Sequence, residues 1–343
     1  MVELLRISVI GGGGWGLALT KLLVDQGHVL SVWEHNPAFL LELQNARSNF
    51  KLLPNVVLDK SVRFTGDIKD IVISKPQIII LATPAQFIRS TLTGFESSSV
   101  KELWQSLELL AVVNVAKGIE ENTLLTIDKI LLEMLPSNVH DKICALSGPS
   151  HAEEVSRGIP TTVVIAGSNE ELLISLQRVF SNSYFRVYRS SDLIGVEIGG
   201  AVKNIIAIAA GIVSGLGFGD NTIGALLTRG IVEIQRFGVA LGAKPDTFLG
   251  LSGIGDLITT ATSLHSRNRF VGCEIGKGRK LKEIIASMNM IAEGVATTRS
   301  VWQSAQKLGV EMPIVNQVYA VLYEDKDPHT AISDLMTREL KAE

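Results

Sequence analysis

The chain has 343 residues, of which 46% are hydrophobic and 20% charged, and 32 basic against 35 acidic residues give a formal net charge of −3. This composition supports buried cores and excludes a disordered chain, and no basic stripe indicates nucleic-acid binding. The only two cysteines, Cys144 and Cys273, lie far apart in the sequence and exclude both a disulfide framework and cysteine metal-ligand spacing.

Short β-branched runs alternate with helical patterns through the first half of the chain. Alternation of this kind favours a parallel sheet with right-handed crossovers, and strands that are apolar throughout favour cover on both faces. A helix is expected over Trp15–Asp25, with Gly27 as its left-handed cap. The expected strands are Ile7–Ile10, Val29–Trp33, Arg63–Thr65, Ile78–Ala82, Leu109–Asn114, Ile143–Leu146 and Thr162–Ile165.

Helical patterns dominate from about residue 191. Long helices are expected at Asp192–Ser214, Ile223–Leu241, Thr297–Lys307 and Val315–Tyr323. The sequence therefore predicts an α/β fold of two domains, with a mostly parallel sheet in residues 1–190 and an all-helical domain in residues 191–343. The apolar helical domain could support a homodimer, but no interface is identified.

The sequence predicts no membrane insertion. The most apolar segment, Asn204–Phe218, is shorter than the roughly 20 residues that span a bilayer, and Lys203 and Asp220 flank it. The N-terminus runs directly into the strand that ends at Ile10, without the pattern of a secretory signal. A cytoplasmic protein is expected.

A glycine-rich loop follows the first expected strand. Gly11, Gly13 and Gly16 form a G-x-G-x-x-G frame that opens a helix, and Gly14 and Trp15 lie within it. Gly11 permits a tight turn, Gly13 a close approach of the backbone to a pyrophosphate, and Gly16 close packing of the helix on the sheet. The loop predicts a Rossmann-like dinucleotide-binding domain; the alternative is a merely flexible turn.

A carboxylate follows the second expected strand. Glu34 stands about 20 residues beyond the glycine loop, where it can accept from the ribose 2′-hydroxyl of NAD and repel the 2′-phosphate of NADP. His35 beside it could face the ribose or a phosphate. We therefore expect NAD or NADP as cofactor, with a slight preference for NAD; alternatively, Glu34 points to solvent.

Polar residues also follow two later strands. Lys117 comes just after a buried strand, and Ser147–Ser150 follows the next one. Ligands of open α/β sheets bind beyond the carboxyl ends of the strands, so these residues are expected near the nicotinamide or the substrate. The alternatives are a surface lysine and an ordinary turn.

Lys203 stands inside an apolar helix rich in small residues. Burying an unpaired ammonium is costly, so this lysine needs partners or a depressed pKa, unless it extends to the surface. A lysine tuned in this way suits general acid–base chemistry on an alcohol and ketone pair. Asp256, in the glycine-rich turn Gly250–Thr260, could pair with it and bind a substrate hydroxyl.

Ser266-Arg267-Asn268-Arg269 offers donors for a phosphate. The arginine fork matches phosphate oxygens, and the serine and asparagine add neutral donors. The alternative is a helix cap followed by solvated arginines. Six scattered histidines show no metal-binding spacing, and no metal site is predicted.

Taken together, these segments resemble the bacterial NAD(P)-dependent glycerol-3-phosphate dehydrogenases over nearly the whole chain. The run Gly199–Asn204 and the triplet Ser266–Asn268 carry most of this resemblance. The matching stretches, these two included, are Gly11–Gly16, Val115–Gly118, Ser147–Ser150, Phe185–Tyr188, Gly195–Asn204, Gly217–Gly219, Thr228–Gly230, Gly253–Asp256, Ser266–Asn268, Glu293–Gly294 and Met312–Ile314.

The resemblance implies a role for particular residues. Lys203 matches the family's catalytic acid/base lysine, and Lys117 matches a lysine that contacts both cofactor and substrate. Substrate-binding positions are matched by Gly148, Ser150, Asp256, Ser266, Arg267 and Asn268. Cofactor-binding positions are matched by Trp15, His35, Ala152, Arg267, Ile291 and Glu293, and Thr260 falls near this group.

The resemblance implies reversible reduction of dihydroxyacetone phosphate to sn-glycerol 3-phosphate, which supplies glycerophospholipid synthesis. Three positions depart from the family: Gly14 where serine is common, Thr83-Pro-Ala85 in place of Val-Pro-Ser, and Glu34 in place of a small or neutral residue. Two alternatives remain: a related lysine-dependent β-hydroxyacid dehydrogenase or ketopantoate-type reductase, and a catalytically silent dinucleotide sensor.

Overall fold

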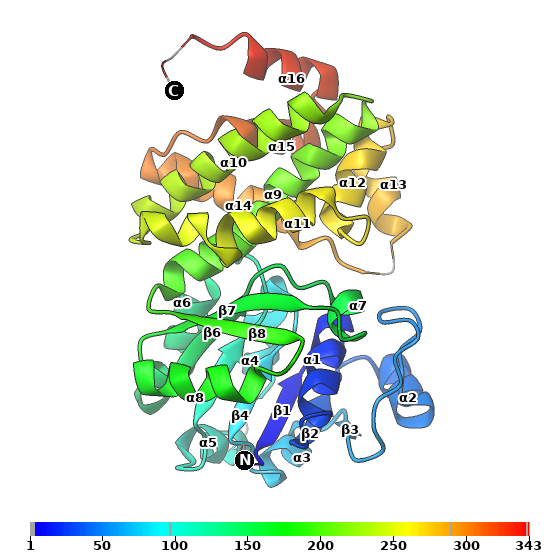
Figure 1. Ribbon diagram of the computed structural model, residues 1–343, viewed down its shortest axis with the longest axis vertical. Coiled ribbons are helices and arrows are strands. Elements are labelled where there is room, and N and C mark those ends of the chain that lie inside the picture. Colours follow the sequence, from blue (N-terminus) through cyan, green and yellow to red (C-terminus); the bar gives the residue numbers. More distant parts are fainter. Residues whose placement is uncertain (1–3, 96–97, 289, 341, 343) are drawn as a thin grey trace. The chain divides into compact units, whose positions relative to one another are not determined.

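The computed structural model describes residues 4–95, 98–288, 290–340 and 342 (Figure 1). The chain forms two compact units, the first made of Met1–Lys117 and Thr126–Glu197, the second of Gly118–Leu125 and Ile198–Glu343. The single boundary predicted near residue 190 differs from this division in two respects. The units divide inside a helix, and the short segment Gly118–Leu125 belongs with the second unit.

The first unit is built on an eight-stranded sheet within the described residues, in the order β3-β2-β1-β4-β5-β6-β7-β8. All neighbouring strands pair in parallel except β6 and β7, which are antiparallel. The strands are β1 Arg6–Ile10, β2 Val29–Trp33, β3 Arg63–Thr65, β4 Ile78–Leu81, β5 Ala111–Asn114, β6 Ile143–Ser147, β7 Thr161–Gly167 and β8 Phe185–Ser190.

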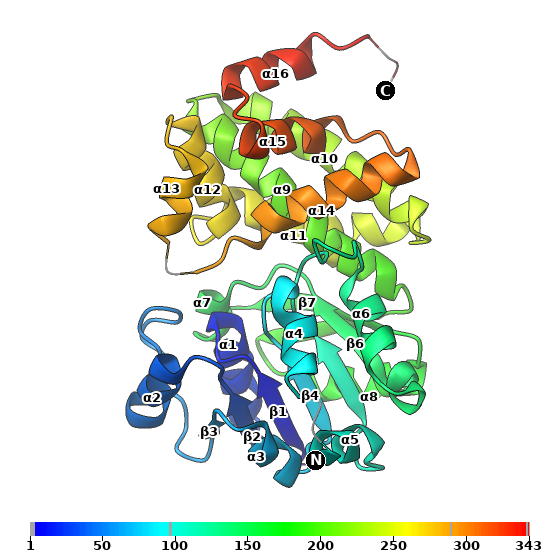
Figure 2. The same ribbon diagram turned by 180° about the vertical axis from the view of Figure 1, so that it is seen from behind.

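Helices cover both faces of this sheet, which is why β4, β5 and β6 are buried along their whole length. Helices α1 and α8 lie on one face (Figure 1), and α4 and α6 lie on the other (Figure 2). The helices of this unit are α1 Gly14–Val24, α2 Pro37–Ala46, α3 Ile68–Ile73, α4 Ile88–Thr93, α5 Ser98–Gln105, α6 Ile127–Met134, α7 Ala152–Val155 and α8 Glu170–Phe180, with 3₁₀ turns η1 Ala85–Phe87 and η2 Ser137–Lys142.

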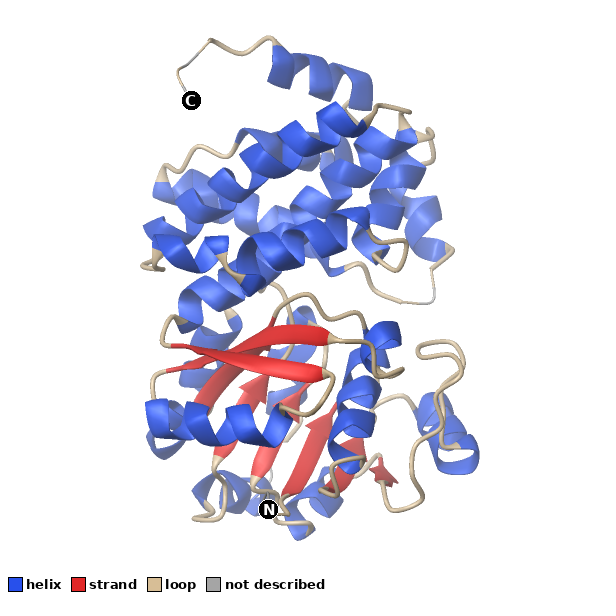
Figure 3. Cartoon of the chain, viewed as in Figure 1, coloured by secondary structure: helices blue, strands red, loops and turns tan. Residues whose placement is uncertain are grey.

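In the described part of the second unit the regular elements are all helices (Figure 3). Its elements are α9 Leu193–Gly215, which starts in the first unit, α10 Asp220–Ala240, η3 Pro245–Leu249, η4 Leu251–Gly255, α11 Asp256–Thr262, α12 Arg267–Gly276, α13 Leu281–Ala286, α14 Glu293–Leu308, α15 Pro313–Tyr323 and α16 Pro328–Met336. The α/β fold predicted from the sequence, a mostly parallel sheet followed by a helical domain, is confirmed.

Helix α9 is the core helix of the second unit. Among the described residues it alone has the length, 23 residues, and the apolar composition to cross a membrane, and its apolar window is wholly buried. The apolar segment predicted from the sequence, Asn204–Phe218, therefore leaves out the N-terminal part of this helix. Its apolar side chains contact protein.

Two pairs of glycines bring α9 and α12 into backbone contact. A Cβ at Gly272 of α12 would overlap the carbonyl oxygen of Ile208, and one at Gly276 would lie 2.6 Å from that of Ile212. Cβ atoms at Gly211 and Gly215 of α9 would overlap α12 in the same way. Without side chains at this seam, the helices approach closely enough to bring the start of α12 beside Asn204.

Two parts of the structure differ from the sequence-based predictions. Strand β8 is not among the predicted strands, whereas the antiparallel pairing of β7 with β6 is compatible with the mostly parallel sheet that was predicted. The segment Gly250–Thr260, predicted as a glycine-rich turn, is helical: one π-helical turn, η4, runs directly into α11.

Candidate active site

The glycine loop lies at the carboxyl end of β1 and opens α1. Gly11 has φ +116°, and a Cβ there would come within 2.9 Å of the backbone of Ala82 and Thr83. Gly13 is the N-cap of α1 and provides no side-chain acceptor, so the first amides of this 11-residue helix are open to an anion. No heavy atom lies within 4 Å of a Cβ placed at Gly13, which leaves space for a pyrophosphate.

Glu34 is bound to this loop. Its side chain is only 9% exposed, and its carboxylate accepts hydrogen bonds from the backbone amides of Gly12 at 2.9 Å and Asn36 at 2.7 Å. The alternative that Glu34 points to solvent is therefore wrong. The neighbouring His35 is exposed, with its ring centroid 6.1 Å from that of Trp33.

The space beside Gly14 is filled by the loop that follows α2. A Cβ at Gly14 would lie 2.7 Å from the carbonyl oxygen of Leu52, closer than real Cβ contacts allow. The serine that the family resemblance led us to expect at this position would require the Leu52 loop to move. Backbone amides are left to bind a phosphate here.

Polar groups gather at the carboxyl ends of β4, β5 and β6. The half-buried Lys117 donates a hydrogen bond to the carbonyl oxygen of Gly148 at 3.0 Å, and the Ser150 hydroxyl donates to the same oxygen at 3.1 Å. The buried hydroxyls of Thr83 and Ser147 have no hydrogen-bond partner among the residues that the structure describes. Unsatisfied buried hydroxyls at the end of a sheet that carries a phosphate loop indicate a polar ligand.

The ammonium of Lys203 is buried in the second unit. Lys203 is 4% exposed and donates hydrogen bonds to the carboxylate of Asp256 and the hydroxyl of Thr260. Thr260 lies one turn beyond Asp256 on α11, and its hydroxyl also donates to Asp256 at 3.3 Å. Lys203 therefore has the partners that its burial demands and does not extend to the surface.

Next to this ion pair, two asparagines bridge three helices. The side-chain amide of Asn268 donates to the Asn204 side-chain oxygen at 2.9 Å, and its own oxygen accepts from the Gly294 amide at 2.9 Å. A Cβ at Gly294 would lie 2.7 Å from that Asn268 oxygen, so glycine is required there. These contacts bring the starts of α12 and α14 beside the lysine-bearing turn of α9.

Two family models match the chain. The NAD-dependent glycerol-3-phosphate dehydrogenase N-terminus matches residues 6–173, and the corresponding C-terminus matches residues 192–333. The chain belongs to the NAD(P)-dependent glycerol-3-phosphate dehydrogenase family.

Relatives of this family match the chain over 98–99% of its length. Glycerol-3-phosphate dehydrogenase [NAD(P)+] of Geobacter sp. (strain M21) is 46% identical over 338 residues, which are 98% of both chains. The protein of the same name from Fusobacterium nucleatum is 48% identical over 340 residues, 99% of both chains. The crystal structure of glycerol-3-phosphate dehydrogenase from Coxiella burnetii superimposes with a TM-score of 0.90 at 32% identity, covering 98% of this chain and 99% of that one.

The start of α12 holds three of the six residues that the family resemblance assigned to substrate binding. Ser266 is the N-cap and accepts from the Arg269 amide at 3.2 Å, as the helix-cap alternative predicted. Asn268 is buried in the asparagine bridge, whereas Arg267 remains half exposed with one nitrogen 3.5 Å from the Ile291 carbonyl oxygen. An arginine at the positive end of a ten-residue helix suits a phosphate.

The other predicted cofactor positions are distributed over both units. In the first unit Trp15 is partly buried against the core and Ala152 is buried at the start of α7. In the second unit Ile291 is half exposed and Glu293 begins α14. Neither Asn204 nor Thr83 is predicted as a site residue from the sequence. For Asn204 a signal was present, because a side-chain amide inside an apolar helix requires polar partners just as the Lys203 ammonium does.

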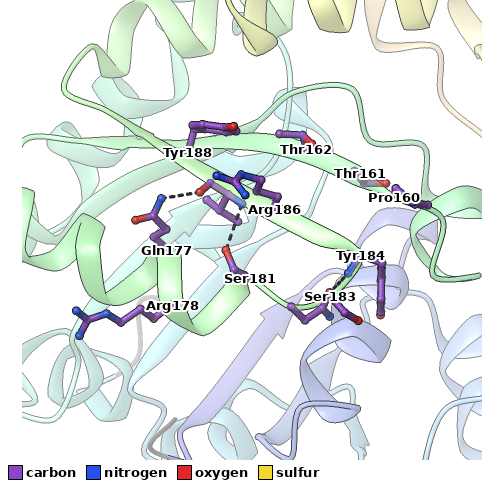
Figure 4. A pocket seen from close by; sticks show the side chains of 12 residues that line it. Pro160, Thr161, Thr162, Gln177, Arg178, Ser181, Ser183, Tyr184, Arg186 and Tyr188 are labelled. Atoms are coloured by element: carbon purple, nitrogen blue, oxygen red, sulfur yellow. Dashed lines mark hydrogen bonds between the residues drawn. The ribbon is translucent and has the colours of Figure 1, made fainter. Parts of the chain in front are cut away.

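A groove of about 530 Å³ lies elsewhere in the first unit, between α8 and the strands β7 and β8, of which β8 is the edge strand (Figure 4). Gln177 donates to the Val187 carbonyl oxygen at 2.7 Å, and the Val187 amide donates to the Ser181 hydroxyl at 3.2 Å. The side chains of α8 thus occupy backbone groups of the edge strand, which limits pairing with other chains. None of the predicted site residues lines this groove.

Proposed function

We propose that this chain interconverts dihydroxyacetone phosphate and sn-glycerol 3-phosphate with NAD(P). The observation that supports this most is the buried ion pair of Lys203 and Asp256, held by Thr260 in a chain of the glycerol-3-phosphate dehydrogenase family. A proton donor held in a water-poor environment suits the reduction of a ketone, because an alkoxide develops there in the transition state.

The first unit has the features that a dinucleotide requires. Gly11, Gly13, Gly14 and Gly16 would hold the pyrophosphate through backbone amides, and the open amides at the start of α1 fit this group. Trp15, Glu34, His35 and Ala152, with Arg267, Ile291 and Glu293 of the second unit, complete the proposed cofactor set. When bound, the nicotinamide supplies or accepts the hydride.

The second unit supplies the general acid and the side chains that bind the substrate phosphate. We assign Lys203 as the group that protonates the developing alkoxide and removes the proton in reverse, with Asp256 orienting its ammonium. Ser266, Arg267 and Asn268 bind the phosphate, and binding energy at this remote group positions the reacting carbon. Lys117, with Gly148 and Ser150, adds positive potential and polar contacts for the substrate.

A substrate screen tests the proposed reaction. Oxidation of NADH should be rapid with dihydroxyacetone phosphate and at least about 100-fold slower with keto acids such as ketopantoate, since these lack the phosphate that Arg267 grips. Preference for a keto acid would favour the related reductase activity. Binding of NADH without turnover of any phosphorylated ketone would favour a dinucleotide sensor.

Replacement of Arg267 by alanine should raise the KM for dihydroxyacetone phosphate by about 10–100-fold, the value of a lost charge-assisted hydrogen bond. The kcat should change far less, because the proton donor stays in place. Steady-state kinetics of Arg279→Ala serve as the control, because Arg279 pairs with Glu274 at the other end of α12. An unchanged KM in Arg267→Ala would remove this residue from the phosphate site.

We expect a preference for NADH over NADPH in kcat/KM, because the Glu34 carboxylate repels a 2′-phosphate. Glu34→Gln removes this charge and should narrow the preference by about tenfold, the effect of about 1.4 kcal/mol. The matched control is Glu42→Gln, which neutralises a nearby carboxylate on α2 that binds the Phe50 amide. A strong NADPH preference in the unaltered enzyme would refute the assignment of Glu34.

We also propose that the enzyme works in the cytoplasm without membrane insertion and supplies glycerophospholipid synthesis. The complete burial of the apolar window of α9 supports the absence of membrane insertion, since no lipid-facing surface remains on that window. The apolar second unit could form a homodimer. The mass of the protein in solution, measured by light scattering, tests that state directly.

A further inference from the structure

A buried polar cluster in the first unit lies outside the groups assigned above. It comprises Asn114 at the end of β5, Asp128 in the first turn of α6 and Glu197 on α9, which are 1%, 4% and 8% exposed. One carboxyl oxygen of Glu197 accepts from the Asn114 side-chain amide at 2.8 Å. The other accepts from the Asp128 backbone amide at 3.0 Å. Glu197 therefore joins the end of a strand to the start of a helix.

This cluster reaches the proposed site through Asn114. The side-chain oxygen of Asn114 accepts from the Ala116 amide at 2.9 Å, which fixes the backbone just after β5. Lys117 is the next residue, and its ammonium donates to the Gly148 carbonyl oxygen. Two hydrogen bonds and one peptide unit thus separate the Glu197 carboxyl from the backbone of Lys117.

The position of the cluster along the chain adds to this argument. The chain leaves the first unit after Lys117, returns at Thr126 and leaves again after Glu197. Asn114 and Asp128 lie within three residues of the first two of these crossings, and Glu197 lies at the third. The cluster therefore joins the chain segments next to all three crossings. The backbone that carries Lys117 is consequently held in place although the next eight residues, Gly118–Leu125, belong to the other unit.

The cluster buries two carboxyl groups, which is energetically unfavourable if its only role is to stabilise the fold. Burial raises the pKa of Glu197 well above its usual value, and the nearby Asp128 carboxyl acts in the same direction. The Asp128 carboxyl in turn accepts from the Thr126 hydroxyl and lies 3.9 Å from the Lys129 ammonium. Apolar side chains of similar size would avoid the cost of burying two carboxyl groups, so the arrangement suggests a role in geometry.

We propose that Glu197 is a positioning residue for Lys117 and acts on it through Asn114. The inference rests on the proposed role of Lys117 in binding substrate and cofactor. Displacement of a binding group by about 1 Å can cost up to 100-fold in rate, so loss of the link should reduce kcat/KM without removing any group that touches the substrate.

A double-mutant cycle tests this link. Glu197→Ala should lower kcat/KM for dihydroxyacetone phosphate by about tenfold in the unaltered enzyme, and by less than about twofold when Lys117→Ala is already present. Asn114→Ala should behave in the same way and covers the case in which Glu197→Ala fails to fold. Glu197→Gln keeps the carbonyl acceptor for Asn114 and should restore most of the activity.

The matched control is Glu233→Ala in the second unit. Glu233, inside α10, is also a buried glutamate whose carboxylate binds the start of another helix: it accepts from the Ile314 amide at 2.8 Å and the Val315 amide at 3.3 Å, both in the first turn of α15. Its replacement should lower Tm but give the same fold-loss of kcat/KM with and without Lys117→Ala. If the losses of Glu197→Ala and Lys117→Ala in kcat/KM add, the positioning role of Glu197 is wrong, but the proposed role of Lys117 is unaffected. If Lys117→Ala has a normal kcat/KM, the proposed role of Lys117 is wrong and this inference fails with it.

Discussion

Lys203→Ala is expected to lower kcat by about 10²–10⁴-fold, the usual contribution of a positioned proton donor. The ammonium of Lys203 is fixed by Asp256 and Thr260 in a buried environment, where a charge aimed at a developing alkoxide has its largest effect. Because the loss falls on the transition state, kcat and kcat/KM should decrease together. Single-turnover oxidation of NADH measures the chemical step directly.

The fold of this variant needs its own control, since Lys203→Ala leaves a carboxylate that is 2% exposed without its cation. Breaking a buried ion pair in this way costs about 3–5 kcal/mol. The double variant Lys203→Ala/Asp256→Ala removes both charges and should regain stability but not activity. Binding of NADH to each variant, followed by fluorescence, reports whether the first unit is intact. Near-normal turnover in a folded variant would eliminate the proposed acid.

The strands of the first unit could be predicted closely because their burial on both faces leaves continuous apolar runs. The segment Val29–Trp33 coincides with β2, and the segment Ile78–Ala82 exceeds β4 by one residue. Strand β8 lacks this signal, because Arg186 and Tyr188 lie on the exposed face of this edge strand and Arg189, near its end, is exposed as well. The direction of β7 could not be predicted, since the choice between parallel and antiparallel pairing depends on the path of the chain.

The pairing of Lys203 with Asp256 follows from electrostatics alone. An ammonium in an apolar helix requires a carboxylate, and Asp256 stands in a segment whose glycines allow close approach. Thr260 follows one turn later on the same face of α11, but this could not be predicted while the segment was taken as a turn. The hydrogen bond from Gly12 to Glu34 likewise depends on the exact path of the glycine loop.

The same reasoning would have found Glu197. It stands six residues before Lys203 in the apolar helix α9, and a buried carboxyl there needs partners as much as the lysine does. Its partners Asn114 and Asp128 are 83 and 69 residues away in sequence. Only the fold identifies them, because Asn114 ends a strand and Asp128 starts a helix, where neither side chain stands out.

Gly272→Ala is expected to reduce the free energy of unfolding by about 3 kcal/mol, at the upper end of the usual cost of overpacking. The new methyl group would overlap the carbonyl oxygen of Ile208, a backbone atom of the core helix α9 that cannot rotate away. The two helices would have to separate, which also moves Arg267 and Asn268 at the start of α12. In thermal unfolding Tm should fall by about 6–12 °C, and the KM for dihydroxyacetone phosphate should rise.

A helical glycine without such a neighbour provides the control. No heavy atom lies within 4 Å of a Cβ at Gly224 in the exposed part of α10, so Gly224→Ala should stabilise the protein by about 0.5–1 kcal/mol through the higher helix propensity of alanine. Gly272→Ala is therefore expected to lower the free energy of unfolding and Gly224→Ala to raise it. The difference between the two changes separates the effect of the backbone contact between α9 and α12 from the effect of helix propensity. A Tm for Gly272→Ala equal to that of the unaltered protein would show that α9 and α12 do not meet backbone to backbone. The close approach that places Asn268 beside Asn204 would then need another cause.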